Sequence, residues 1–260
     1  MSGHVAEADR HEARADRKPE RVKRIGHKGA DTIRPGNTLE SFQAAVEIGV
    51  DMIEFDVLAL RDSGVDGAPD APSPLVVAHD WAEVAEREPL TLTAALDAFT
   101  RPPLVGVELD LDLKLPGRED ELVECVRAAG LVDRTMVSTM YVESLDEIAR
   151  LEPGIQRGLT FPRVTRDWRG MRWARPLVAL RLATMRRQLP RIALSKIGAH
   201  GLHAMWIYEA LITAPVVHAV HQGGTQVIAW TVDEAERIQS LRELGVDGIC
   251  SNDPRLLQVA

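Results

Sequence analysis

The stretch RIGHKGADTIRPGNTLESFQAAVEIGVDMIEFDV, residues 24–57, decides the fold class of this chain. An apolar run at Val22–Gly26 precedes a helical pattern that Thr38 opens as N-cap and Gly49 closes. A second apolar run, Asp51–Leu60, follows at once. Two apolar runs joined by an amphipathic helix predict two parallel strands and their connecting helix.

The rest of the chain repeats this alternation of strand and helix. Further strands are expected at Leu75–Ala78, Leu104–Leu115, Arg134–Ser138, Ile155–Thr160, Val227–Thr231 and Gly248–Ser251, and further helices at Leu92–Phe99, Glu119–Gly130, Ser144–Leu151 and Asp233–Leu244, with a last one opened by Asp253-Pro254. One unit, around Ile192–Ile197, is unclear. About eight such units predict an α/β fold of the closed (β/α)8 TIM-barrel type rather than an open sheet.

Three segments fall outside this rhythm. Residues 1–21 are charged and Ala-rich without an apolar centre, so we expect a flexible leader before a barrel domain at 22–260. The stretch Asp62–Pro74, rich in Gly, Pro and Asp, predicts an inserted loop after the second strand. Residues 163–191 carry nine arginines and one acid, with Trp, Met and Leu interleaved. This segment is either a solvated helical hairpin or a basic amphipathic flap that contacts anionic lipid headgroups or a phosphate substrate.

Bulk composition narrows the class of protein. A net charge of −8 argues against general nucleic-acid binding. Cys125 and Cys250 lie far apart without metal-site spacing, which favours a reducing cytoplasm. No apolar stretch reaches the roughly 18–20 residues that a membrane span needs. The sequence leaves the oligomeric state open.

Chemically reactive side chains stand where apolar runs end. His27 follows the first strand, and His79 follows Leu75–Ala78. Polar groups at the ends of buried strands are where α/β enzymes place their chemistry, and two imidazoles can share acid and base work. We therefore expect the two histidines to belong to one site.

Two carboxylates on the second strand predict a metal site. Glu54 and Asp56 are spaced i, i+2, so they point to the same side of an otherwise apolar strand. Oxygen ligands without zinc-type motifs indicate one divalent cation, Mg²⁺ or Ca²⁺. A third ligand is expected from a neighbouring strand, on which the acids Glu108, Asp110 and Asp112 share one face with Lys114, a residue suited to an anionic substrate.

Taken together, these motifs resemble the glycerophosphodiester phosphodiesterase family. The matching pieces cover nearly the whole predicted barrel, and it is their order that makes the resemblance specific. They are Gly26-His27-Lys28-Gly29, Pro35-Gly36-Asn37-Thr38, Glu54-Phe55-Asp56-Val57, Ala78-His79-Asp80, Asp112-Leu113-Lys114, Ala229-Trp230-Thr231-Val232-Asp233, Gly245-Val246-Asp247-Gly248-Ile249 and Ser251-Asn252-Asp253-Pro254.

The resemblance implies a TIM barrel that cleaves small-molecule phosphodiesters, such as glycerophosphocholine, into glycerol 3-phosphate and an alcohol. By motif, it makes His27 and His79 the acid/base pair. It assigns the remaining roles as follows: Glu54, Asp56 and Asp112 as metal ligands, and Lys28, Lys114 and Trp230 as substrate-binding residues.

Three positions depart from the family pattern. Lys28 replaces the usual arginine and loses its bidentate fork. Gly36 stands where the family has a glutamate, and Asp112 is one methylene shorter than the usual glutamate. Glu108 or Asp110 therefore remain alternative third ligands.

Two rival functions remain. One is phospholipase D-like cleavage of lysophospholipids in the same fold, which the basic segment at 163–191 favours. The other is a catalytically impaired barrel that binds a phosphorylated ligand.

Overall fold

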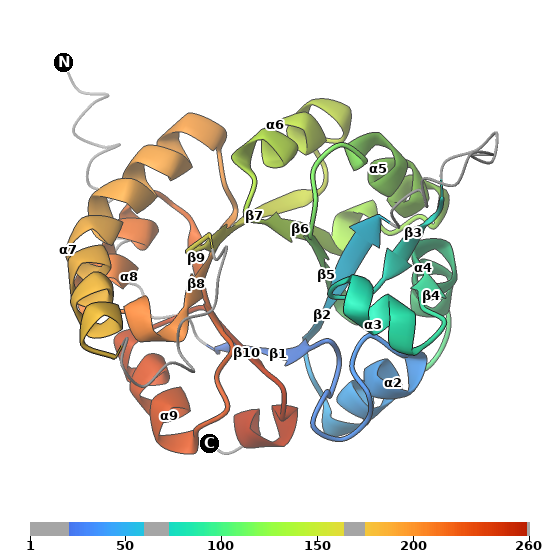
Figure 1. Ribbon diagram of the computed structural model, residues 1–260, viewed down its shortest axis with the longest axis horizontal. Helices are drawn as coiled ribbons and strands as arrows, with labels where there is room; N and C mark the ends of the chain where they lie inside the picture. Colours follow the sequence, from blue (N-terminus) through green and yellow to red (C-terminus); the bar gives the residue numbers. More distant parts are fainter. Residues whose placement is uncertain (1–20, 60–72, 164–174, 259–260) are drawn as a thin grey trace.

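Eight parallel strands close into a barrel in the computed structural model, which describes residues 21–59, 73–163 and 175–258 (Figure 1). Their order around the barrel is β1-β10-β9-β8-β7-β6-β5-β2, and β1 also pairs with β2, which closes the ring. The predicted TIM barrel is thereby confirmed. The bounds are β1 Lys23–His27, β2 Met52–Ala59, β5 Glu108–Leu113, β6 Thr135–Thr139, β7 Gln156–Phe161, β8 Ala204–Tyr208, β9 Gln226–Trp230 and β10 Gly248–Ser251.

Helices surround this ring on its outside (Figure 1). The first of them, α2, begins and ends as its sequence predicts. At its start, the Thr38 side chain accepts from the backbone N of Ser41 at 3.2 Å, and at its end Gly49 adopts the left-handed conformation (φ 94°). The helices are α2 Leu39–Ile48, α3 Trp81–Glu86, α4 Leu92–Phe99, α5 Glu119–Ala128, α6 Val142–Leu151, α7 Arg175–His200, α8 Ala214–Gln222 and α9 Ala235–Leu244, with 3-10 turns η1 Val132–Arg134, η3 Glu209–Leu211 and η4 Pro254–Leu257.

One predicted strand lies outside the barrel, and one barrel strand was missed. β3 (Leu75–Val77) runs antiparallel to β2 and pairs in turn with β4 (Leu90–Thr91). The uncertain unit at Ile192–Ile197 is part of α7, and the missing barrel strand is β8. A five-residue buried run such as Ala204–Tyr208 has no polar alternation, so periodicity alone does not separate it from a helix.

The core forms two layers. Between barrel and helices, Phe42, Phe55 and Phe99 pack with ring centroids 5.1–5.7 Å apart, and none of the three is solvent-exposed. Inside the barrel, a smaller apolar cluster includes Met136 and Trp206. This part of the barrel interior is therefore filled by side chains.

The acidic side chains of β5 face the inside of the barrel, because Leu109, Leu111 and Leu113 belong to the outer layer. They divide along the barrel axis. Glu108, at the start of the strand, forms an ion pair with Lys23, the first residue of β1. The end of the same strand lies at the opposite rim, where all eight parallel strands finish.

Asp51 ties the first two strands together at the bottom of the barrel. Its carboxylate accepts from the backbone N of Arg24 at 2.9 Å, and from the guanidinium groups of Arg24 and Arg21 at 2.8–3.1 Å. Partial burial would raise the pKa of Asp51, but these bonds outweigh it and lower the pKa. This cluster therefore stabilises the fold while Asp51 is ionised.

The basic segment is helical from Arg175 onward. α7 covers the last part of residues 163–191 and continues to His200, whereas residues 164–174 lie outside the described residues. So do the predicted leader up to residue 20 and most of the loop after β2. Among the described helices, none is long and apolar enough to cross a membrane.

Candidate active site

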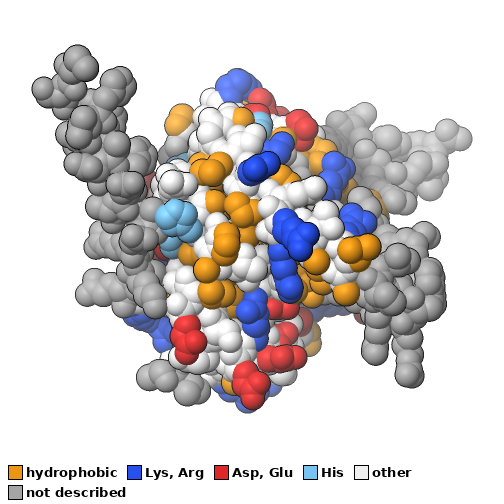
Figure 2. Space-filling view, turned by 90° about the vertical axis from the view of Figure 1, so that its left-hand side faces the viewer, with side chains coloured by type: hydrophobic (Ala, Val, Ile, Leu, Met, Phe, Trp, Pro, Cys, Tyr) orange, Lys and Arg blue, Asp and Glu red, His pale blue; other side chains and the backbone are white. Residues whose placement is uncertain are grey.

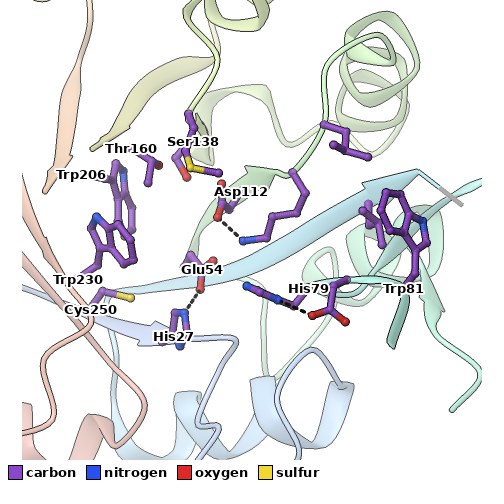
Figure 3. A pocket seen from close by; sticks show the side chains of 15 residues that line it. His27, Glu54, His79, Trp81, Asp112, Ser138, Thr160, Trp206, Trp230 and Cys250 are labelled. Carbon is purple, nitrogen blue, oxygen red and sulfur yellow. Dashed lines mark hydrogen bonds and ion pairs between the residues drawn. The ribbon is translucent and has the colours of Figure 1, made fainter. Parts of the chain in front are cut away.

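A pocket of about 470 Å³ opens at the mouth of the barrel (Figure 3). It collects predicted site residues from distant parts of the chain: both histidines, two of the three acids, Lys114 and Trp230 line it. The full lining is His27, Glu54, Leu58, His79, Asp80, Trp81, Asp112, Lys114, Leu115, Ser138, Met140, Thr160, Trp206, Trp230 and Cys250.

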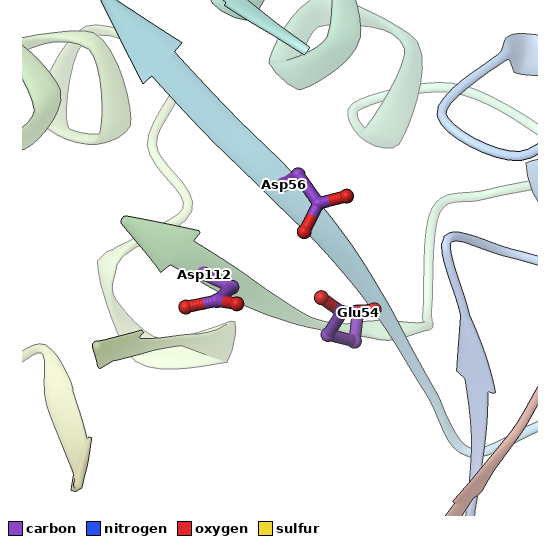
Figure 4. A group of neighbouring side chains, drawn as sticks. All are labelled: Glu54, Asp56 and Asp112. Carbon is purple, nitrogen blue, oxygen red and sulfur yellow. The ribbon is translucent and has the colours of Figure 1, made fainter. Parts of the chain in front are cut away.

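Strand register brings the three acids together. His27 on β1 lies beside Glu54 on β2, and Asp56 lies beside Asp112 on β5. Glu54 and Asp56 face inward from the same strand, since they are two residues apart. Each of the three acids offers an oxygen within 4.8 Å of the other two (Figure 4).

Asn37 orients Asp56. Its amide Nδ2 donates to Asp56 Oδ2 at 2.9 Å, while its Oδ1 accepts from the backbone N of Asp56 at 3.2 Å. Asn37 is buried and has a φ of 59°, a left-handed conformation that asparagine tolerates better than most residues. The other oxygen of Asp56, Oδ1, is buried, has no hydrogen bond within the described residues, and forms an ion pair with Lys114.

Lys114 lies between Asp56 and Asp112 and forms ion pairs with both. Burial opposes the charged form of this lysine, yet the surrounding carboxylates raise its pKa above the ordinary value. If Glu54 is also ionised, the cluster carries two negative charges in excess. A divalent cation has the charge that this excess requires, and the donor set consists of the oxygens that Mg²⁺ and Ca²⁺ prefer.

The pKa of Glu54 reflects the negative charge that no cation compensates. Burial, reinforced by the charge of Asp56, raises the pKa of Glu54 to about 8. Burial would also raise the pKa of Asp56, but the charges of Lys114 and the histidines lower it. Without a cation, Glu54 thus retains a proton near neutral pH, and a cation would take the place of that proton. The residues present therefore fit a divalent metal.

His27 is held by a chain of side chains from the last strands. Its Nδ1 lies 2.6 Å from Oδ1 of Asn252. Asp233 fixes that amide, because it accepts from Asn252 Nδ2 at 2.7 Å and from Asn252 N at 2.9 Å. With Asn252 Oδ1 as acceptor, the Nδ1 of His27 carries a hydrogen. Nε2, 3.9 Å from Glu54, faces the acids.

His79 occupies the start of α3. Asp80 caps this helix by accepting from two backbone N–H groups, and its other oxygen lies 3.2 Å from His79 Nδ1. The backbone N of His79 donates to Glu83 at 2.8 Å. The His79 side chain is half exposed, and it lines the same pocket as His27 (Figure 3).

The geometry favours Asp112 over its two alternatives as third ligand. Glu108 is paired with Lys23 at the opposite end of the barrel. Asp110 lies one layer below the mouth and accepts from Ser138 Oγ at 2.7 Å. Burial raises the pKa of Asp110 well above its ordinary value.

Two departures from the family pattern have a visible structural setting. Lys28 is not among the residues that line the pocket, and its backbone N donates to Glu54 Oε2 at 3.0 Å. At Gly36, an added Cβ would come within 2.5 Å of Asp31, whose carboxylate accepts from the Gly36 backbone N at 2.8 Å. Any side chain at position 36 would require this turn to move.

Sequence reasoning missed the two asparagines that orient site residues. Asn37 and Asn252 both lie in quoted motifs, but no role was expected for them. The Asn252–His27 contact joins residues 225 positions apart, so local spacing carries no trace of it. For Asn37, the preceding Pro35-Gly36 pair signals a turn in which a left-handed asparagine is common.

Fold and site together define a TIM barrel with an acidic, histidine-flanked mouth, and known proteins are similar to this chain in sequence and in fold. A glycerophosphodiester phosphodiesterase from Caldanaerobacter subterraneus is 25% identical over 268 residues, covering 90% of this chain and 95% of that protein. A glycerophosphodiester phosphodiesterase structure from Parabacteroides distasonis has a TM-score of 0.68 at 19% identity, covering 91% and 95% of the two chains.

A phosphodiesterase structure from Oleispira antarctica, solved with the product sn-glycerol-3-phosphate, has a TM-score of 0.64 at 18% identity, covering 91% and 95%. These likenesses to solved structures show the fold. The model of the glycerophosphoryl diester phosphodiesterase family matches residues 27–65 and 105–256, which is well over half of the sequence. The chain therefore belongs to this family, and the expected membership is confirmed.

Proposed function

We propose that this protein hydrolyses glycerophosphodiesters to glycerol 3-phosphate and an alcohol, with one divalent cation and two histidines. The observation that carries the proposal is the convergence of His27, Glu54, His79, Asp112 and Lys114 on one pocket. Membership of the family supplies the reaction class, and the Oleispira antarctica structure supplies the chemistry of a product bound by a relative.

Glu54, Asp56 and Asp112 would hold the cation. When bound, the cation supplies positive charge for the non-bridging phosphate oxygens. Lys114 adds a second positive charge at the same wall of the pocket, where charge develops in the transition state. The Trp230 indole N–H is buried without a hydrogen-bond partner among the described residues, so a substrate oxygen is a suitable acceptor for it.

The two histidines divide the proton transfers. One accepts the proton of the attacking hydroxyl, from water or from the substrate itself, and the other protonates the leaving alkoxide. Each transfer is worth roughly 10²–10⁴-fold in rate. Asn252 holds the His27 proton on Nδ1, which leaves Nε2 for the reaction. Asp80 steadies the His79 ring through the equivalent nitrogen.

A second candidate substrate class has its own observation. Much of the pocket wall is apolar, with Leu58, Trp81, Leu115, Met140 and Trp206 around the polar centre. Apolar walls suit a substrate that carries a hydrocarbon chain as well as a phosphate, which favours lysophospholipids. We therefore keep phospholipase D-like cleavage as the alternative.

We also propose a cytoplasmic location. It is supported by two thiols that are free in the structure, Cys125 and Cys250.

The test is a panel of soluble glycerophosphodiesters and a lysophospholipid, each assayed with Mg²⁺ and with Ca²⁺. We expect metal-dependent release of glycerol 3-phosphate from at least one soluble diester. His27→Ala and His79→Ala should each remove nearly all turnover while the circular dichroism spectrum stays that of the wild type.

Other outcomes separate the alternatives. Turnover confined to the lysophospholipid would select the phospholipase D-like reaction. No turnover of any diester, together with measurable binding of glycerol 3-phosphate, would select the impaired binding barrel. Wild-type rates in either histidine variant would refute the acid/base assignment.

A further inference from the structure

The long helix α7 carries an exposed face that the fold does not use. Its inner side packs through Leu189, Ala193 and Ile197, all buried. Its outer side presents Leu180 and Leu194, with 66% and 40% of their surface exposed. Among the described residues, only one other large hydrophobic side chain is exposed to this degree. Leu180 and Leu194 lie about four turns apart, so they are two separate apolar positions on one side of the helix.

Arginines share that outer side. Leu180, Arg187, Arg191 and Leu194 fall within about 60° of the helix circumference at roughly 100° per residue. All four are exposed. No ion pair or hydrogen bond is found for the side chains of Arg187 and Arg191 within the part of the chain that the structure describes. We call these four residues the α7 face.

The surroundings reinforce the charge of the α7 face. α7 contains six arginines and lysines and no acid, and the adjacent helix α8 contains no acid either. Figure 2, which faces this side of the molecule, shows basic side chains among hydrophobic ones across its centre and right, with acidic side chains at the upper and lower edges. In a chain of net charge −8, this is a local reversal of sign.

We propose that the α7 face docks on an anionic lipid bilayer. Positive charge beside exposed leucines is the composition that binds headgroups and enters the interface between headgroups and acyl chains. A nucleic acid would use the arginines but leave the leucines in water. It would also be repelled by the rest of this acidic chain.

The position of α7 connects this surface to the catalytic mouth. Arg186 Nε donates to the backbone O of Ala210 at 2.7 Å, and Ala210 belongs to η3, which directly follows the mouth end of β8. The part of α7 around Arg186 therefore lies on the mouth side of the barrel. Where the inference concerns substrate supply, it rests on the proposed function: docking would place the mouth near diesters formed from membrane phospholipids.

The experiment is flotation of the full chain with vesicles of phosphatidylcholine, with and without about one third phosphatidylglycerol. We expect binding only to the anionic vesicles, weakened by added salt. Each arginine near such a surface contributes about fivefold, so Arg187→Gln with Arg191→Gln should bind about 30-fold more weakly. Leu180→Ser should bind the anionic vesicles roughly tenfold more weakly than the wild type, since it removes a side chain that would be buried in the interface.

A matched control separates the place of the charge from its amount. Arg101→Gln with Arg255→Gln removes two other exposed arginines, with 68% and 61% of their side chains exposed, one just after α4 and one in η4. Anionic-vesicle binding by this control should equal the wild type. The proposal would be overturned if the wild type bound no vesicles, or if both double variants lost vesicle binding equally. It would also be overturned if the Arg187→Gln, Arg191→Gln variant lost binding to duplex DNA but not to vesicles.

Turnover of a soluble glycerophosphodiester is measured in parallel. Variants of the α7 face should retain it, because no residue of this face lines the pocket. Vesicle binding without turnover in the wild type would refute the proposed function and leave docking standing. Turnover without vesicle binding would do the reverse.

Discussion

Asn252→Ala tests how the structure positions His27. The variant removes the acceptor that lies 2.6 Å from His27 Nδ1 and leaves the backbone bond from Asn252 N to Asp233 in place. Whether His27 is acid or base, its ring is cationic on one side of the proton transfer. A hydrogen bond to a charged group contributes about 1.5–3 kcal/mol, so we expect kcat to fall about 10- to 150-fold.

Two further readouts distinguish positioning from general damage. Asn252 does not line the substrate pocket, so KM should change little. Burial lowers the pKa of His27 below its usual range, whereas the Asn252 bond raises it. The variant should therefore lower the His27 pKa further, and the limb of the pH–rate profile that His27 contributes should move to lower pH.

The assay is steady-state hydrolysis of a soluble glycerophosphodiester across pH, with thermal unfolding as a check on the fold. Asp253→Asn is the matched control: it alters the neighbouring side chain, which bonds to Arg255 rather than to His27. An Asn252→Ala enzyme with wild-type kcat would refute the positioning argument. So would an equal loss in both variants or an unmoved pH limb.

Three further changes test other parts of the structure. Asp51→Asn should lower the free energy of unfolding by about 1–3 kcal/mol at pH 7, measured in urea; because the bonds from Arg24 lower the Asp51 pKa, this difference should start to shrink below about pH 4 and vanish only below the lowered pKa, and a pH-independent loss would contradict the assignment. Phe99→Ala should cost about 3–5 kcal/mol of unfolding free energy, and a loss under 1 kcal/mol would mean that the aromatic cluster is not a packed core. Lys114→Met should reduce kcat and, because it leaves Asp56 unpaired, should make the melting temperature more dependent on added Mg²⁺ than in the wild type; equal Mg²⁺ dependence would argue against a shared cation site.

The barrel was predictable because its strands and helices alternate in a regular pattern. The helix Leu92–Phe99 appears within the predicted bounds, and the end-of-strand positions of His27 and Glu54 follow from apolar runs alone. The strand count was right for a partly wrong reason. Leu75–Val77 pairs antiparallel beside the barrel, whereas Ala204–Tyr208 closes it. Pairing direction depends on tertiary contacts that a short buried run does not encode.

The site was predictable where chemistry follows strand position and less so where it depends on packing. Alternation along β5 indicated an inward acidic face, but not that Glu108 would pair with Lys23 at the far end. It did not show that Asp110 would lie fully buried, with Ser138 as its hydrogen-bond donor. Glu108, Asp110 and Asp112 differ in how far along the barrel axis they lie. The alternation of polar and apolar residues shows which face of the strand they share, but not this position along the axis. The asparagine contacts depend on loops that meet only in the folded chain.

The decisive experiment on the proposed metal site measures phosphodiester turnover as a function of free Mg²⁺ or Ca²⁺, with wild type, Asp112→Ala and Glu108→Ala compared side by side. We expect the wild type to lose activity in a chelator and to regain it with a single-site saturation curve. Asp112→Ala should stay inactive at every metal concentration, while Glu108→Ala follows the wild type. Full activity in the chelator, or an Asp112→Ala curve like that of the wild type, would refute a catalytic cation held by Asp112.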